Sequence, residues 1–112
     1  MARIELHNLS KSCNEALILG VLADGPKHGY QVALEIEQRS GGYFKFYLGT
    51  LYPILHKLEK DGFIKGTWAP DSGRRKKLYA LTDRGGVTAR EVAATWRTFF
   101  QKLGGLLETI EP

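Results

Sequence analysis

The sequence predicts a mainly α-helical fold that contains one small β hairpin. Apolar residues recur at helical spacing in three segments before residue 62, and two short alternating segments then flank a turn at residues 69–73. One long helical pattern occupies most of the remaining chain. Because 112 residues suit one domain and leave little room for two, we expect these elements to form a single compact unit.

The composition is that of an ordinary globular chain, with 43% hydrophobic and 25% charged residues. The longest apolar run, residues 16–23, is far shorter than the roughly twenty residues of a membrane-spanning helix, so no membrane span is expected. No basic and apolar leader opens the chain, which argues against export. Cys13 is the only cysteine and cannot form an internal disulfide, which fits a cytoplasmic protein.

The first helix is predicted from a capping pattern. Ser12 and Glu15 have the spacing of a capping box, with Ser12 as the N-cap. The apolar run to Ala23 follows, and because it is apolar on nearly every side we expect this helix at the centre of the core. Residues 24–26, Asp-Gly-Pro, would end it.

The second helix is predicted over residues 28–39. Val32, Ala33 and Ile36 form its apolar stripe. The next segment, residues 43–47, is short, aromatic and alternating, so it could form a stub of strand.

The third helix is predicted to begin near Gly49 and to end before Gly62, since glycine is favoured just after a helix. Pro53 falls in its first turn, where a missing N–H group is tolerated. Residues at i, i+4 and i+7 make one apolar face: Leu51, Leu55 and Leu58. The opposite face carries donors and cations, namely Tyr52, His56 and Lys60, with Pro53 and Lys57 alongside.

A hairpin and a long helix complete the chain. The hairpin pairs residues 63–68 with residues 76–81. Thr82 caps a last helix over residues 83–110, in which Gly104 and Gly105 predict a weak point or a kink. Its apolar positions follow alternating steps of three and four, the spacing of a two-helix seam: Ala89, Val92, Trp96, Phe99, Leu103, Leu106 and Ile110.

The net charge of +4 lies in one segment. Residues 1–48 and residues 85–112 are each neutral, whereas residues 57–84 carry eight basic and four acidic side chains. A confined basic stretch is typical of a protein that binds a polyanion such as nucleic acid. The alternative is a solvated surface without a partner.

Three helices followed by a hairpin are the order of a winged helix-turn-helix. In that fold the third helix enters the major groove of duplex DNA, and the hairpin, or wing, contacts the backbone or the minor groove. We therefore expect residues 1–82 to form an N-terminal arm and a DNA-binding domain. Residues 83–112 would form a helix for dimerisation that belongs to the same compact unit.

The residues also match a family. The segment Gly49-Thr50-Leu51-Tyr52-Pro53, running into Leu58-Glu59 and Asp61-Gly62, resembles the PadR-like transcriptional regulators, particularly their short subfamily. Leu19–Leu22 with Gly29-Tyr30, Gly73-Arg74-Arg75, Tyr79 with Leu81-Thr82, and Gly85 extend the resemblance over nearly the whole chain. It implies a dimeric winged-helix repressor joined through its C-terminal helix. Some short members hold planar aromatic ligands against a tryptophan of that helix, and Trp96 stands at a similar position.

Pattern and resemblance together give the candidate sites. The DNA contacts are expected from Tyr30, Thr50, Tyr52, Pro53, His56, Lys57, Lys60, Arg74, Arg75, Lys76 and Lys77. The dimer contacts are expected from Val92, Trp96, Phe99, Leu103 and Leu106. A dimer with two-fold symmetry would read an inverted-repeat operator and block transcription, and a small planar effector could release it.

Two of these residues allow alternatives. Trp96 could serve dimer packing alone, since an aromatic residue at seam spacing is usually part of a core, or it could stack on an effector. Tyr30 could face the core, or it could contact phosphates near the start of the second helix together with Lys27 and His28.

Other classes of function are disfavoured. Cys13 and the three histidines have no zinc-site spacing, so neither a metal nor a cofactor is expected. The serines show no nucleophile pattern and no phosphate-binding glycine loop follows a strand, so we expect no enzyme. A winged helix that binds an acidic protein instead of DNA remains the alternative function.

Overall fold

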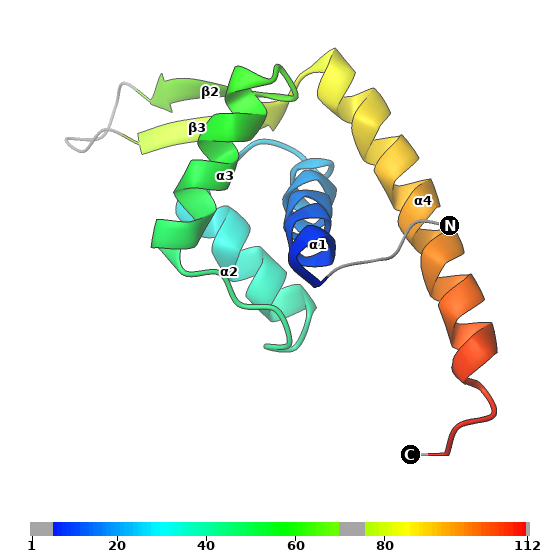
Figure 1. The fold of residues 1–112 in the computed structure, drawn as a ribbon. Helices are drawn as coiled ribbons and strands as arrows, with labels where there is room; N and C mark the ends of the chain where they lie inside the picture. The colour runs from blue at the N-terminus through cyan, green and yellow to red at the C-terminus, as the bar shows by residue number, and fades with distance from the viewer. Residues whose placement is uncertain (1–5, 70–75, 112) are drawn as a thin grey trace.

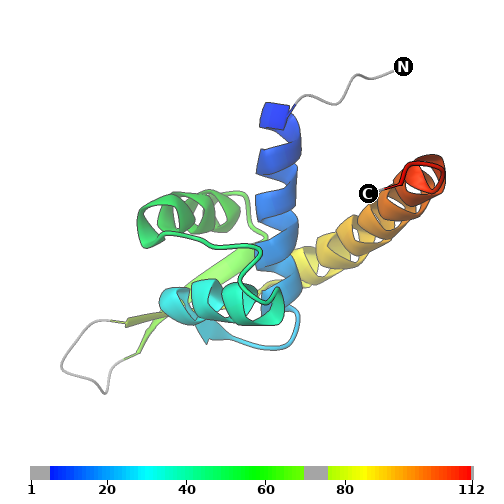
Figure 2. The same ribbon diagram turned by 90° about the horizontal axis from the view of Figure 1, so that it is seen from below.

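The computed structural model describes residues 6–69 and 76–111. The elements are α1 (Leu6–Leu22), β1 (Lys27–His28), α2 (Gly29–Arg39), α3 (Leu48–Lys60), β2 (Ile64–Ala69), β3 (Lys76–Leu81) and α4 (Asp83–Leu107). Figure 1 shows α1 between α2 and α4, with the sheet at one end of the helices. Figure 2 shows α4 leading away from the other elements. The predicted fold class, mainly helical with a small β hairpin, is confirmed, and β2 and β3 are called the wing below.

The core is formed by the apolar faces that the periodicity predicts. It contains Ile18, Leu19, Val21 and Leu22 of α1, Val32, Ala33 and Ile36 of α2, Leu51, Leu55 and Leu58 of α3, and Ile64 and Tyr79 of the sheet. Because α1 packs against α2, α4 and β3, its apolar residues are needed on several sides, as the nearly all-round apolar pattern indicated. The hydrophobic effect thereby holds α3 on the body by one face and leaves its other face free.

The sheet has one strand more than the hairpin predicted. Its order is β1-β3-β2, and both pairs are antiparallel, with Gly66 opposite Tyr79 and Lys27 opposite the same tyrosine. The two residues of β1 are too few to show an alternating pattern, so only the pairing with β3 reveals this strand. It fixes the start of α2 beside the wing.

The strand predicted at residues 43–47 is wrong, because this segment is irregular. Phe44 and Phe46 instead turn toward the core and pack against it. Ser40 supports this path, because its Oγ accepts a hydrogen bond from the N–H of Phe44 at 3.0 Å. Burial of two aromatic rings and a local side-chain bond therefore replace the pairing that a strand would need.

The N-cap predicted at Ser12 is also wrong, because α1 begins at Leu6 and contains Ser12. Residues 6–11 hold neither glycine nor proline, so nothing in the sequence stops the helix from extending toward the N-terminus. A capping box is a local preference, and the longer helix overrides it here.

Glycine and threonine define the other helix ends as expected. Gly62 follows α3 with a φ of +83°, and the N–H of Phe63 donates to the carbonyl of Leu58 across it. Thr82 caps α4, because its Oγ1 accepts from the N–H of Gly85 at 3.0 Å. The same hydroxyl donates to the carbonyl of Gly62 at 2.7 Å and so joins the end of α3 to the start of α4.

α4 ends at Leu107, slightly before the predicted residue 110. It remains helical through Gly104 and Gly105, so the predicted weak point does not interrupt the helix. Its distal half extends beyond the other helices (Figures 1 and 2). The turn predicted at residues 69–73 falls largely outside the described residues. Arg74 and Arg75, predicted as DNA contacts, also lie outside them.

Candidate nucleic-acid interface

The outward face of α3 is polar, as the sequence predicts. The predicted contact residues Thr50, Pro53, His56, Lys57 and Lys60 are all exposed on it. Tyr52 differs from them, because it is half-buried and packs against the core. A helix with one buried leucine face and one exposed polar face can present side chains to a partner without loss of its own packing.

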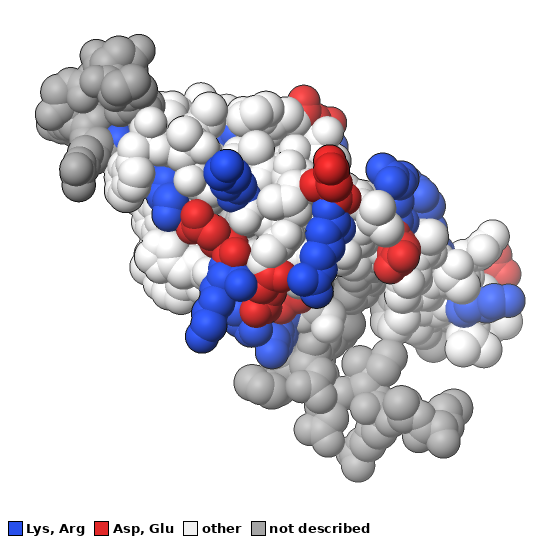
Figure 3. All heavy atoms as spheres, turned by 90° about the horizontal axis from the view of Figure 1, so that it is seen from above, with Lys and Arg blue, Asp and Glu red and all other residues white. Residues whose placement is uncertain are grey.

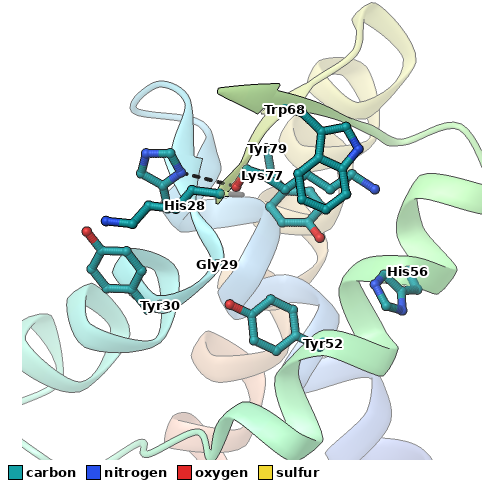
Figure 4. Close-up of a pocket in the computed structure, with 9 residues that line it drawn as sticks. His28, Gly29, Tyr30, Tyr52, His56, Trp68, Lys77 and Tyr79 are labelled. Atoms are coloured by element: carbon teal, nitrogen blue, oxygen red, sulfur yellow. Dashed lines mark hydrogen bonds between the residues drawn. The ribbon is translucent and has the colours of Figure 1, made fainter. Parts of the chain in front are cut away.

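A hollow of about 360 Å³ lies between α3, the wing and the start of α2. It is lined by His28, Gly29, Tyr30, Tyr52, His56, Trp68, Lys76, Lys77 and Tyr79. Figure 4 shows the aromatic rings of Tyr52, Trp68 and Tyr79 around it, with His56 at its edge. The fold thus gathers five of the predicted contact residues, which come from three separate elements, on one concave surface.

The absence of a side chain at Gly29 allows Tyr52 to reach into this hollow. A Cβ atom at Gly29 would lie 2.7 Å from Tyr52 Cε1 and 2.9 Å from its hydroxyl oxygen. A Cβ atom does not lie within 3.0 Å of a non-bonded heavy atom, so the close approach of α2 and α3 depends on glycine at this position.

The start of α2 is tied to the wing by polar and aromatic contacts. His28 Nδ1 donates to the backbone oxygen of Lys77 at 3.2 Å, and its backbone N–H donates to Gln31 Oε1 at 2.8 Å. The rings of His28 and Tyr30 are stacked with centroids 6.0 Å apart. Tyr30 is 44% exposed and lies 5.5 Å below Lys76 Nζ, so it is not a core residue.

The two adjacent lysines of β3 have different surroundings. Lys76 is exposed and lies over the Tyr30 ring. Lys77 donates to Glu59 Oε1 at 2.8 Å, and the N–H of Gly66 donates to the other carboxylate oxygen at 3.0 Å. The hydrogen bond to Glu59 raises the pKa of Lys77, and the same bond lowers the pKa of Glu59.

Lys57 also has an acidic partner. It forms an ion pair at 3.0 Å with Asp61, the C-cap residue of α3, and the hydrogen bond to Asp61 raises the pKa of Lys57. Figure 3 shows acidic side chains between basic ones on the side of the molecule that carries the wing and the start of α4. The basic segment is therefore partly neutralised by the chain itself.

A second apolar hollow, of about 230 Å³, lies between α1 and α4. It is lined by Cys13, Ala16, Leu17 and Gly20 of α1, by Phe44, and by Ala89, Val92, Ala93, Trp96 and Phe100 of α4. Trp96 makes ring contacts with Phe99 and Phe100 at centroid distances of 5.3 and 5.5 Å. The predicted seam includes Ala89, Val92 and Trp96 of this lining but omits Ala93 and Phe100. It could not include α1, because the pattern of one helix gives no information about the helix beside it.

The distal part of α4 exposes the predicted seam. Leu103 and Leu106 are exposed, as are Phe100, Leu107 and Ile110 beside them. The exposed fraction is largest for Leu106, at 78%. Exposed apolar side chains in a continuous stripe mark a surface for interaction.

No group of three or more side chains able to hold a metal ion occurs among residues 6–69 and 76–111. None of the helices found there is both long enough and apolar enough to cross a bilayer.

Comparisons with known proteins agree with this architecture. The negative transcriptional regulator PadR of Bacillus subtilis (strain 168) is 35% identical over 69 residues, which cover 61% of this chain and 38% of that protein. A solved PadR family transcriptional regulator from Eggerthella lenta superposes with a TM-score of 0.77 at 29% identity, covering 93% of this chain and 89% of that one.

A second similar structure was solved with nucleic acid. Bacillus subtilis PadR in complex with operator DNA has a TM-score of 0.63 at 29% identity, covering 69% of this chain and 44% of that one. The matched part therefore covers less than half the length of that regulator.

The family assignment rests on the sequence profile. Residues 18–91, more than half of the chain, match the transcriptional regulator PadR-like family. This match confirms the expectation of a regulator and not an enzyme. From its sequence and its fold alike, the chain belongs to the PadR-like family of transcriptional regulators.

Proposed function

We propose that this regulator is a homodimeric repressor that binds an inverted-repeat operator through α3 and the wing. The observation that carries the proposal is the exposed polar face of α3 beside a concave surface lined by aromatic and basic side chains. The operator complex of the similar Bacillus subtilis protein supports it. Such a regulator would act in the cytoplasm.

Each element has a separate task in this proposal. Thr50, Tyr52, Pro53 and His56 lie at or near the front of α3, where side chains of a recognition helix reach base edges. Lys57, Lys60, Lys76 and Tyr30 contact phosphates, and Arg74 and Arg75, which lie outside the described residues, add further phosphate contacts. Contacts to phosphates set affinity and register, whereas contacts to bases set sequence preference.

A second copy of the chain covers the exposed stripe of α4. The stripe contains Leu103 and Leu106, and the hollow between α1 and α4 offers an apolar surface of the same kind. Val92 and Trp96 line that hollow, and Phe99 contacts Trp96 beside it. Burial of apolar surface at about 25 cal/mol per Å² drives such an association.

Trp96 then has two roles. It packs at the dimer seam, and its ring lies at the edge of an apolar hollow in which a small planar aromatic effector could stack. An effector bound there changes the spacing of the two α3 helices and releases the operator.

Selection of duplexes from a random pool by the full chain tests the DNA proposal, with mass measured by light scattering in the same buffer. We expect an inverted repeat and the mass of a dimer. Binding that is no tighter than to random duplex at physiological salt would refute it. The adaptor alternative needs an apolar outward face on α3, whereas that face is polar.

A further inference from the structure

We propose that Lys77 is a positioning residue that clamps the wing to the recognition helix α3. Its place in the basic segment predicts a phosphate ligand instead. This inference rests on the proposed DNA binding. The clamp consists of Glu59 near the end of α3, Lys77 of β3 and Gly66 of β2.

Glu59 connects α3 to both strands of the wing. One carboxylate oxygen accepts from Lys77 Nζ at 2.8 Å, and the other accepts from the N–H of Gly66 at 3.0 Å. β2 is an edge strand of the sheet, so this N–H has its partner in the side chain of Glu59. Two charge-assisted hydrogen bonds accepted by one carboxylate therefore fix the base of the wing relative to α3.

The side chain of Lys77 is mostly covered by its neighbours. A Cβ atom at Gly66 would overlap Lys77 Cε, so the aliphatic stem crosses β2 where a side chain is missing. The ammonium lies 5.5 Å from the ring centroids of Trp68 and Tyr79. The side chains of Lys77 and Glu59 are 22% and 29% exposed. A lysine held in this way would have to leave an acidic partner and two rings to reach a phosphate.

The neighbouring Lys76 provides the contrast. Both lysines line the hollow, but successive side chains of a strand leave it in different directions, so their immediate surroundings differ. Lys76 is exposed and forms no ion pair with any residue in the described ranges. The basic segment thus contains a cation available to DNA and a cation used within the protein.

A fixed wing matters because α3 and the wing contact different parts of the duplex. If their relative position is set before binding, little conformational freedom is lost on the DNA. Loss of the clamp should therefore weaken operator binding without removing a phosphate contact.

Salt dependence separates these roles. Each neutralised phosphate contributes about 0.9 to the slope of log K against log salt. The full chain and a duplex selected by it are used, and the variants are Lys77→Met and Lys76→Met. We expect Lys77→Met to lose about tenfold in affinity with its slope unchanged, and Lys76→Met to lose about 0.9 of slope. A slope reduced by about 0.9 in Lys77→Met, or no change in its affinity, would overturn the inference.

Two further variants open the clamp without removing Lys77. Glu59→Gln makes the protein more positive, so charge alone predicts tighter binding, whereas the clamp predicts weaker binding. Gly66→Ala keeps every charge but expels the lysine stem, and we expect the same loss as in Lys77→Met. Tighter binding by Glu59→Gln, or wild-type affinity in Gly66→Ala, would contradict the clamp.

A measurement on the free protein keeps the two proposals apart. If the wild type selects no duplex, the proposed function fails, and amide hydrogen exchange at Gly66 still tests the clamp. Glu59→Ala should accelerate that exchange, because the amide loses its partner. Unchanged exchange would count against the clamp whatever the DNA results.

Discussion

Gly85 lies directly against the backbone carbonyl of Phe63, so closely that a Cβ atom on the glycine would overlap the carbonyl oxygen. The same oxygen accepts the N–H of Thr82 at 3.1 Å. Gly85 is therefore where α4 passes over the segment that joins α3 to the wing. Since the obstructing atom belongs to the backbone, a rotamer change cannot relieve the overlap.

We predict opposite effects of alanine at the two adjacent glycines of α4. Gly85→Ala should destabilise the protein by about 3 kcal/mol, because overpacking against backbone forces the helix to move. Gly86→Ala should be neutral or stabilising by about 0.5–1 kcal/mol, because a Cβ there meets only the Arg90 guanidinium, at 3.9 Å. Urea unfolding at one protein concentration measures both. Equal effects of the two substitutions would contradict the contact with Phe63.

The ion pair between Glu59 and Lys77 predicts a pH dependence of stability. The folded protein lowers the pKa of Glu59, so the stabilisation is present above the ordinary value of 4.5 and is lost as pH falls through the folded value. It raises the pKa of Lys77, so the stabilisation is present below 10.5 and is lost above it. The free energy of unfolding of the wild type should exceed that of Lys77→Met by about 1 kcal/mol from roughly pH 5 to 10.

Urea unfolding of both proteins between pH 3 and pH 8 tests this, and the difference should shrink only at the acidic end. Lys57→Met is the matched control. Its ion pair with Asp61 lies at the surface, with both side chains more than a third exposed, and should contribute little at any pH. A difference for Lys77→Met that grows on acidification would have the wrong sign for this pair.

Much of the fold follows from periodicity. The leucine face of α3, the stripe of α2 and four residues of the apolar run of α1 lie in the core, because burial at helical spacing is a strong signal. The errors occur where local and distant effects compete. β1 exists only through its pairing with β3, and residues 43–47 remain irregular because Phe44 and Phe46 are drawn into the core.

The candidate site was harder to predict than the core. A helical pattern places His56 and Lys60 on the outward face of α3, where they lie. The charge count of the basic segment treats Lys76 and Lys77 as equivalent. It ignores the ion pair that Lys77 forms with Glu59, eighteen positions away. The apolar lining contributed by α1 depends on tertiary packing and has no signal in the sequence of α4.

The contact between Gly29 and Tyr52 gives a third prediction. Gly29→Ala should move the Tyr52 ring out of the hollow, cost about 1–2 kcal/mol of stability and weaken operator binding. In a protein that already carries Tyr52→Ala, the same change at Gly29 should cost almost nothing, since nothing remains to be displaced. Unfolding of the two single variants and the double variant gives the coupling energy. Additive effects would show that the alanine disturbs something other than Tyr52.

The exposed stripe of α4 gives a fourth prediction. Leu106→Glu should leave the fold of one chain unchanged, because this side chain is 78% exposed, and it should weaken the proposed dimer at least tenfold. Gln101→Glu adds the same charge on the opposite face of α4 and is the control. Sedimentation equilibrium measures the dissociation constants. A dimer weakened equally by both changes would place the interface elsewhere.

The reactivity of Cys13 on α1 gives a fifth prediction, which concerns the same proposed interface. Burial raises the pKa of its thiol above the ordinary value of 9.0, so less than about 1% is thiolate at pH 7 and alkylation is slow. The thiol lines the hollow between α1 and α4, which a second copy would cover. We therefore predict that alkylation slows further as protein concentration rises through the dissociation constant, and that Leu106→Glu removes this dependence. Because the variant keeps the local surroundings of Cys13, its rate should equal that of dilute wild type. A rate independent of concentration would mean that the α1 wall stays uncovered in the dimer.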